Sequence, residues 1–133
     1  MIWQVGTNAV FRNQEFDLGE VARSIAAGLD RLAGLPIDVV LMDLQYSTAL
    51  VNPDKIALTG QMVSLISAAA GRAGVNVFRR FALMRRWCAE DSIAIADLID
   101  PADPSQLHMS DWATDCVTRA LDGAIASAPP PAA

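Results

Sequence analysis

The stretch "IDVVLMD" at residues 37–43 is a short, nearly all-apolar run that is rich in branched side chains. A run of this length without alternating polar residues indicates a strand that is covered on both faces. Strands of this kind are typical of parallel sheets, in which crossover helices pack on either side. Residues 37–43 therefore predict a parallel sheet with helices on its faces.

A helix is predicted before this strand, over residues 17–34. Asp17, with Glu20 three residues later, has the spacing of a capping box at the helix N-terminus, and Gly34 marks the C-terminal end. Apolar residues at spacings of three and four define one face of the helix. They are Leu18, Val21, Ile25, Leu29 and Leu32.

Two further elements fit the same alternation of strands and helices. Residues 1–11, "MIWQVGTNAVF", predict a strand that ends in a tight turn at Gly6-Thr7-Asn8. After the strand at 37–43, Asn52-Pro53 predicts the start of a second helix, with Asn52 as its N-cap. That helix is expected to end at Gly71 or Gly74.

The C-terminal half continues the pattern. Residues 75–83, "VNVFRRFAL", predict a third strand that leads into a short helical piece at 84–90. After the loop at 100–106, Ser110 is the expected N-cap of a final amphipathic helix. Its apolar face is expected to hold Trp112, Cys116, Val117, Ala120, Leu121 and Ile125. Such alternation indicates right-handed βαβ units and the α/β class, with the sheet between helices.

Composition excludes several classes of function. The 133 residues, 53% of them hydrophobic, suffice for one domain with a core. The net charge is −5 and the ten Lys and Arg residues are scattered, so we expect no nucleic-acid partner. The apolar runs are too short for a membrane span. Strand-like residues follow Met1, where a signal peptide would begin with a basic stretch. The two cysteines are too few for a zinc site. We therefore expect no membrane span, signal peptide, metal or cofactor.

Three segments are expected at one edge of the sheet, because ligands of such sheets bind beyond the carboxyl ends of the strands. They are Gly6-Thr7-Asn8, residues 43–47, and the loop that precedes His108, the only histidine of the chain. We expect four residues at this edge to line one cleft: Asn8, Gln45, Tyr46 and His108.

One interpretation of this edge is a phosphoacceptor site. The stretch "DVVLMDLQ" at 38–45 resembles the acceptor strand of response-regulator receiver domains, in which Asp43 would take a phosphoryl group. Receivers also need an acidic pair after the first strand and a lysine after a late one. Here the first strand ends in Gly-Thr-Asn, and the only lysine, Lys55, lies at a helix start. We therefore disfavour this interpretation and place Asp43 at the rim of the site.

A second interpretation joins "QVGTNAV" at 4–10 to "QLHMSDWATDCVTRAL" at 106–121. Together these motifs resemble the SGNH/GDSL hydrolase superfamily of esterases and lipases, over roughly residues 1–127. The resemblance implies a three-layer α/β/α, flavodoxin-like domain. It also implies that Asn8, of the Gly-x-Asn motif, stabilises the oxyanion, and that His108, just before the last helix, is the general base. Lining residues of the pocket would be Gly6, Thr7, Gln45 and Tyr46.

The nucleophile of that superfamily is missing from this chain. It lies in a Gly-Asp-Ser motif after the first strand, and a glycine that donates a second oxyanion hydrogen bond follows the next strand. Both precede Gly-x-Asn, and neither occurs here. The resemblance therefore implies an N-terminally truncated, partial SGNH domain at 1–127 that is inactive alone, followed by a disordered tail at 128–133.

The acid of the expected triad also departs from the pattern. The superfamily usually carries aspartate three residues before the histidine, and Ser105 occupies that position here. Asp103 is the possible acid, provided that its loop turns back toward His108; otherwise a backbone carbonyl would orient the ring. We expect that Ser105 does not orient His108, because a hydroxyl stabilises imidazolium less than a carboxylate does.

A non-catalytic interaction or pseudoenzyme module is the alternative to an ester hydrolase. Without the superfamily's first two strands, the apolar strand at residues 2–5 would form an open edge of the sheet. Open apolar edges favour self-association, or pairing with the missing N-terminal portion. The partners expected are therefore an ester substrate and a strand at this edge. Members of the superfamily are often secreted or periplasmic.

Overall fold

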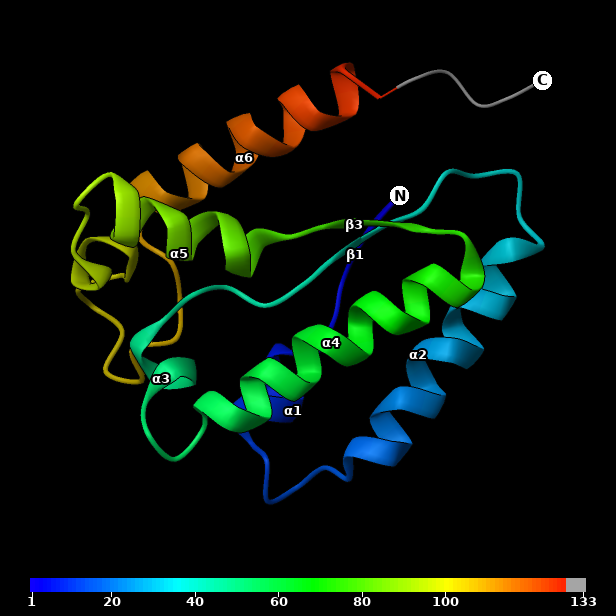
Figure 1. Cartoon of the computed structure of the whole chain (residues 1–133), viewed down its shortest axis with the longest axis horizontal. Helices are drawn as coiled ribbons and strands as arrows, with labels where there is room; N and C mark the ends of the chain where they lie inside the picture. The colour runs from blue at the N-terminus through cyan, green and yellow to red at the C-terminus, as the bar shows by residue number, and fades with distance from the viewer. Residues whose placement is uncertain (129–133) are drawn as a thin grey trace.

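The structure, a computed structural model, describes residues 1–128 and has a parallel sheet of three strands between helices (Figure 1). The strands are β1 (Ile2–Gln4), β2 (Val40–Met42) and β3 (Asn76–Phe78), in the order β1-β2-β3. Leu41 of β2 lies opposite Trp3 on one side and Val77 on the other, and it is fully buried. The prediction of an α/β protein with a flavodoxin-like arrangement is confirmed.

Two long helices cover one side of the sheet. Helices α2 (Leu18–Ala33) and α4 (Ile56–Ala73) lie side by side there, and α6 (Asp111–Ala126) lies on the other side of the strands (Figure 1). The Asp17 side chain accepts a hydrogen bond from the Glu20 amide at 2.9 Å, which confirms the predicted start of α2. Ile25 and Leu29 from the predicted face of α2 are buried. None of the helices within residues 1–128 is long and apolar enough to span a bilayer.

Two short helices were not predicted, and the first of them replaces the turn expected at Gly6-Thr7-Asn8. Gly6 has a left-handed backbone with φ of 92°, and α1 (Thr7–Phe11) follows it directly. A short helix, α3 (Thr48–Val51), ends at Asn52, so Asn52 is not the N-cap of the next helix. Its side-chain oxygen instead accepts from the Asp54 and Lys55 amides in the turn before α4, both at 3.1 Å. Of the two glycines expected to end α4, Gly74 does so, with φ of 67°.

The third strand is shorter than predicted, because a helix begins inside the predicted strand. Helix α5 (Arg80–Glu90) starts two residues after β3. The Phe81 amide in its first turn donates to the Asp43 carboxylate at 2.9 Å. This carboxylate, which comes from the end of β2, satisfies an amide that has no partner within the helix. The apolar pattern of residues 75–83 could not reveal a capping residue so far away in the sequence.

The C-terminal region combines a 3₁₀ helix, η1 (Ile95–Leu98), with α6. Ser110 is the predicted N-cap of α6, since its hydroxyl accepts from the Ala113 amide at 3.2 Å. The buried stripe of α6 runs through Ala113, Val117 and Leu121. Trp112 and Ile125, which were also placed on the apolar face, flank this stripe and are 49% and 52% exposed. Most of the predicted tail, residues 129–133, lies outside the described residues.

Candidate active site

The imidazole of His108 is paired with the carboxylate of Asp103. Nδ1 of His108 lies 2.8 Å from Oδ2 of Asp103, in the loop that leads into α6. The histidine side chain is 72% exposed, whereas that of Asp103 is only 10% exposed. Because an ionised carboxylate only accepts hydrogen bonds, Nδ1 carries the proton in the neutral ring. Nε2 is then the basic atom, and within residues 1–128 it has no hydrogen-bond partner.

Four further hydrogen bonds hold the Asp103 carboxylate. The backbone amides of Ser105, Leu107 and His108 donate to it at 2.8–3.0 Å. The Ser105 hydroxyl lies 2.6 and 2.8 Å from its two oxygens. The hydrogen bond from the His108 amide, followed by that from the Ser105 hydroxyl, holds the pKa of Asp103 well below its usual range. In this geometry Ser105 contacts the carboxylate and the carboxylate contacts the imidazole.

A left-handed residue makes this pairing possible. Gln106 has φ of 55°, a backbone conformation that costs a side-chain-bearing residue about 1 kcal/mol or more. The turn at Gln106 folds the chain back, so that Asp103 reaches a histidine five residues later. The sequence offered no glycine or asparagine to signal a left-handed position here.

Asn8 shares one hollow with His108. Asn8 is exposed at the second position of α1, the helix that begins directly after the left-handed Gly6. A Cβ at Gly6 would lie 2.8 Å from Cγ of Met62 in α4, so a close approach of backbone and helix sets the position of α1. A hollow of about 810 Å³ at the carboxyl end of β1 is lined by both Asn8 and His108. Its other lining residues include Gly6, Thr7, Gln45, Trp3, Glu20 and Ser24.

Tyr46 and Asp43 lie elsewhere than expected. Tyr46 does not line this hollow, and its ring packs edge-on against Phe81 with centroids 5.3 Å apart. Asp43 is 1% exposed and caps α5, so the expectation that it lies at the rim of the site is wrong. Burial raises the pKa of Asp43, while the hydrogen bond from the Phe81 amide opposes the rise.

A buried arginine, which the sequence analysis did not single out, lies behind the site. Arg80 is 4% exposed, and its Nη2 donates to the Asp43 carbonyl at 2.9 Å and to Oε1 of Gln45 at 3.0 Å. Burial lowers the pKa of Arg80 to about 10, and the charge of Asp43 opposes this shift. Arg80 lies two residues after β3, whereas the strand predicted at 75–83 included it, so the sequence pattern gave no signal for it.

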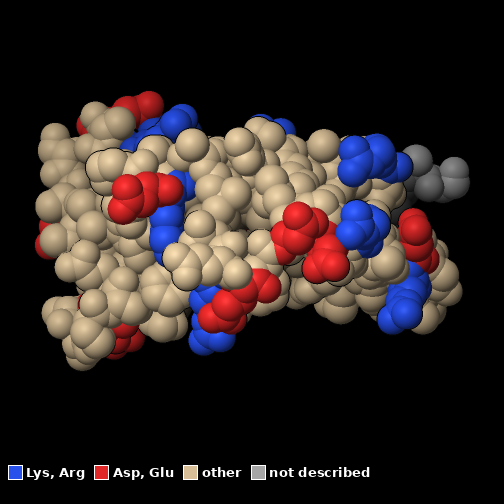
Figure 2. Space-filling model, turned by 90° about the horizontal axis from the view of Figure 1, so that it is seen from below, with Lys and Arg blue, Asp and Glu red and all other residues tan. Residues whose placement is uncertain are grey.

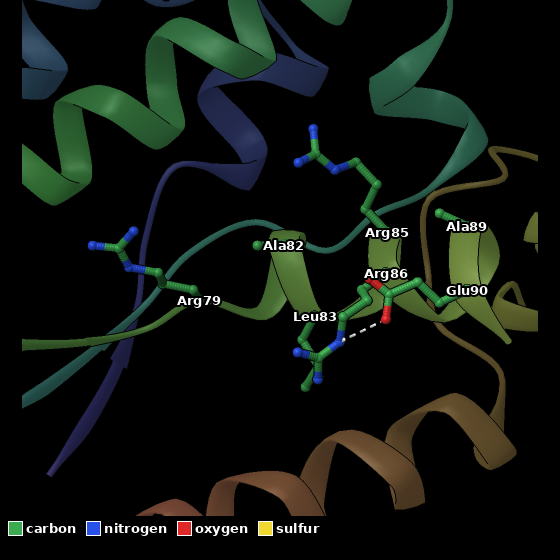
Figure 3. Close-up of a pocket in the computed structure, with 7 residues that line it drawn as sticks. All are labelled: Arg79, Ala82, Leu83, Arg85, Arg86, Ala89 and Glu90. Carbon is green, nitrogen blue, oxygen red and sulfur yellow. Dashed lines mark ion pairs between the residues drawn. The ribbon is translucent and has the colours of Figure 1, made fainter.

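A second hollow lies on the outer surface of α5 (Figure 3). It is lined by Arg79, Ala82, Leu83, Arg85, Arg86, Ala89 and Glu90. The three arginine side chains point in different directions (Figure 3). Arg86 forms an exposed ion pair with Glu90 at 3.9 Å. Because its cations do not converge, this surface lacks the arrangement of an anion site.

Charges elsewhere are interspersed. On the face seen from below, Lys and Arg side chains lie among Asp and Glu side chains (Figure 2). Among the described residues, no group of three His, Cys, Asp or Glu side chains is placed to hold a metal ion. The chemistry that the structure displays is therefore that of the His108–Asp103 pair and the hollow beside it.

Comparison with known proteins gives one family match. The model of the non-GDSL lipase-like family matches residues 1–129, almost the whole chain. The chain belongs to this family. No curated protein and no solved structure gives a significant match.

Membership of the non-GDSL lipase-like family supports a hydrolase-like module. The 133 residues contain no Gly-Asp-Ser sequence. In the part of the chain that the structure describes, no serine hydroxyl is hydrogen-bonded to His108. Ser110 instead donates to the Asp97 carbonyl, Ser47 is 1% exposed, and Ser24 lines the hollow from α2.

Proposed function

We propose that this member of the non-GDSL lipase-like family is a partial SGNH-type hydrolase domain that acts on carboxyl esters. In this proposal His108 is the general base, Asp103 orients it, and Asn8 stabilises the oxyanion. The observation that carries the proposal is the 2.8 Å contact between His108 Nδ1 and Asp103 Oδ2 beside a hollow that Asn8 also lines. Residues 1–127 would form the domain.

The histidine–aspartate pair has the properties that a general base needs. The carboxylate fixes the tautomer with its proton on Nδ1, so Nε2 can accept a proton from an attacking hydroxyl. When Nε2 takes that proton, the charged ring is stabilised by the carboxylate at 2.8 Å. The low pKa of Asp103 keeps it ionised throughout this step.

In this proposal the side-chain amide of Asn8 stabilises the oxyanion. An ester carbonyl under attack places negative charge on its oxygen, and a fixed amide donor stabilises that charge. One such donor typically contributes about 3 kcal/mol to transition-state stabilisation. The packing of Gly6 against Met62 and Ile66 of α4 holds the start of α1, and therefore Asn8, in place.

The nucleophile in this proposal is a serine from a Gly-Asp-Ser segment that lies outside the 133 residues. In the described chain β1 pairs with β2 alone, so its outer edge is available to another strand. Trp3, Gln4 and Val5, in and after β1, line the hollow with His108. A parallel strand added at this edge would therefore end near the hollow that His108 lines.

The reaction would follow the serine-hydrolase course. The serine oxygen bonds to the ester carbon while its proton moves to Nε2, and the alcohol then leaves with that proton. Water attacks the acyl-enzyme in the same way, so that the carboxylic acid is released and the serine is regenerated.

Hydrolysis of p-nitrophenyl esters and labelling by a fluorophosphonate probe test this function. The 133-residue chain should show neither serine-dependent turnover nor labelling. A version extended at its N-terminus by a segment with Gly-Asp-Ser should show both. His108→Ala should abolish both in the extended protein, whereas Asp111→Asn, a nearby carboxylate without contact to the ring, should leave them unchanged.

Two results would contradict the proposal. Stoichiometric labelling of one serine in the 133-residue chain would identify an internal nucleophile instead. An extended protein that stays inactive while it binds a second copy through β1 would favour the non-catalytic interaction module. The exposed apolar residues Met1 and Ile2 at this edge are the observation that favours this second function.

A further inference from the structure

One buried side-chain amide joins the two segments of the candidate site. Gln45 follows β2 and is 5% exposed. Its Oε1 accepts from the Thr7 hydroxyl at 2.9 Å, and its Nε2 donates to the Leu107 carbonyl at 3.1 Å. Thr7 directly precedes Asn8, and Leu107 directly precedes His108. Gln45 therefore bridges segments that are 100 residues apart in sequence.

Arg80 determines which way this amide faces. A guanidinium group only donates hydrogen bonds, and Nη2 of Arg80 lies 3.0 Å from the Gln45 amide. The oxygen of the amide must therefore face Arg80, and the same oxygen accepts from Thr7. The NH₂ group is then directed to the Leu107 carbonyl. Arg80 is itself held by the Asp43 carbonyl at 2.9 Å.

The bridge needs a side chain that both accepts and donates at this length. Glutamate would keep an acceptor for Thr7 and Arg80, but would place an oxygen against the Leu107 carbonyl. Methionine fills a similar volume without forming either hydrogen bond. At 5% exposure, water cannot readily replace a lost partner, so each unmade bond carries the cost of a buried unpaired group.

We propose that Gln45 is the positioning residue of this site and sets the distance between Asn8 and His108. It acts through Thr7 on the Gly6–Asn8 segment and through Leu107 on the His108 loop. The assignment rests on the proposed function for the roles of Asn8 and His108. The contacts themselves can be tested without any turnover.

Two variants each cut one arm of the bridge, and NMR of the 133-residue chain reads the result. Gln45→Glu removes the donor to Leu107, so amide hydrogen exchange at Leu107 and His108 should become about tenfold faster or more relative to global unfolding. Thr7→Val removes the hydroxyl bound to Oε1, so the ring signals of His108, the only histidine, should shift. Thr7→Ser, which keeps the hydroxyl, should restore them.

Thr59→Val is the matched control. The Thr59 hydroxyl, like that of Thr7, is buried, and it donates to the Leu50 carbonyl at 2.7 Å without a hydrogen bond to the site residues. This variant should lower stability while it leaves the His108 signals and the relative exchange of its loop unchanged. Equal effects of Gln45→Glu and Thr59→Val on the loop would overturn the proposal. Unchanged His108 ring signals in Thr7→Val would also overturn the proposal. This second test does not depend on whether Gln45→Glu folds.

An active extended protein offers an independent check. There Gln45→Glu should lower kcat by about tenfold or more with little change in KM, because geometry between base and oxyanion donor matters most in the transition state. If the hydrolase proposal fails, this measurement is lost, but the exchange and ring-signal results still decide whether Gln45 couples the two segments.

Discussion

At the scale of single residues, the His108 loop is organised around one carboxylate. Asp103 accepts from three backbone amides, a hydroxyl and an imidazole, although it lies in an irregular segment at the surface. An anion that satisfies several donors at once gives a loop a defined shape without a regular element. The shape of the loop and the tautomer of its histidine therefore depend on the same group.

The tautomer of His108 can be measured directly. Asp103 should hold the neutral ring with its proton on Nδ1, which ¹⁵N chemical shifts of the single histidine will show at high pH. In Asp103→Asn the side chain can present its NH₂ to Nδ1, so we expect the proton to move to Nε2 in a substantial fraction of molecules. A wild-type ring that is protonated mainly on Nε2 would contradict the pairing described above.

The low pKa of Asp103 also predicts how stability depends on pH. An aspartate whose pKa is lower in the folded chain stabilises the fold above its unfolded value of 3.8. That contribution is lost as pH falls from this value through the lower folded pKa. The difference in free energy of unfolding between wild type and Asp103→Asn should therefore shrink as the pH falls below about 3.8. Urea unfolding at a series of pH values measures this difference. A difference that grows in acid would contradict the lowered pKa of Asp103.

At the scale of elements, α1 shows how a strand end is converted into a site. The chain leaves β1, turns at Gly6 with φ of 92°, and enters a helix of five residues that presents Asn8. A side chain at Gly6 would be strained by this backbone and would also press on Met62 and Ile66 at 2.8 and 2.9 Å. The orientation of α1 is thus coupled to its packing on α4.

Gly6→Ala should therefore destabilise the protein by about 1–3 kcal/mol and displace Asn8. Gly60→Ala is a suitable control, because Gly60 lies inside α4, has no positive φ, and a Cβ there meets no atom within 4 Å. That substitution should stabilise the fold by about 0.5–1 kcal/mol. Chemical denaturation gives both values, and a neutral Gly6→Ala would show that α1 can shift away from α4 at little cost.

At the scale of the whole molecule, the sheet is asymmetric in how its edges are used. The outer edge of β1 has no strand beside it in the described chain, and its first residue, Ile2, is 45% exposed. Exposed apolar edges of this kind promote pairing between chains. The same edge borders the hollow that His108 and Asn8 line. Pairing of two chains at β1 is therefore expected to change how easily a ligand reaches the hollow.

We expect the 133-residue chain to self-associate through β1. Sedimentation velocity should show a concentration-dependent dimer or larger species, and Ile2→Lys should shift it toward monomer, because a charge at an edge strand opposes pairing. Ile125→Lys changes an exposed apolar residue on α6, at 52% against 45% for Ile2, and should have no such effect. A wild-type chain that remains monomeric at high concentration would rule out this use of the edge.

The sequence by itself determined the features that neighbouring residues encode. The apolar run at 37–43 predicted the parallel sheet, and the caps Asp17 and Ser110 predicted the starts of α2 and α6. These signals are local, because a cap satisfies amides two or three residues away and a helical face repeats every three or four. The order of elements along the chain also placed Asn8 and His108 at one edge of the sheet, where both line one hollow.

Only the tertiary structure decided the contacts between distant segments. The Asp43 carboxylate caps α5 from 38 residues away, and Gln45 joins Thr7 to Leu107 across separations of 38 and 62 residues. Asp103 and His108 are closer in sequence, but their pairing depends on the left-handed backbone of Gln106. Glutamine is not a residue type from which a left-handed conformation can be predicted. The physical reason is burial: inside a packed interior, polar groups must find partners wherever the chain places them, and those partners need not be sequence neighbours.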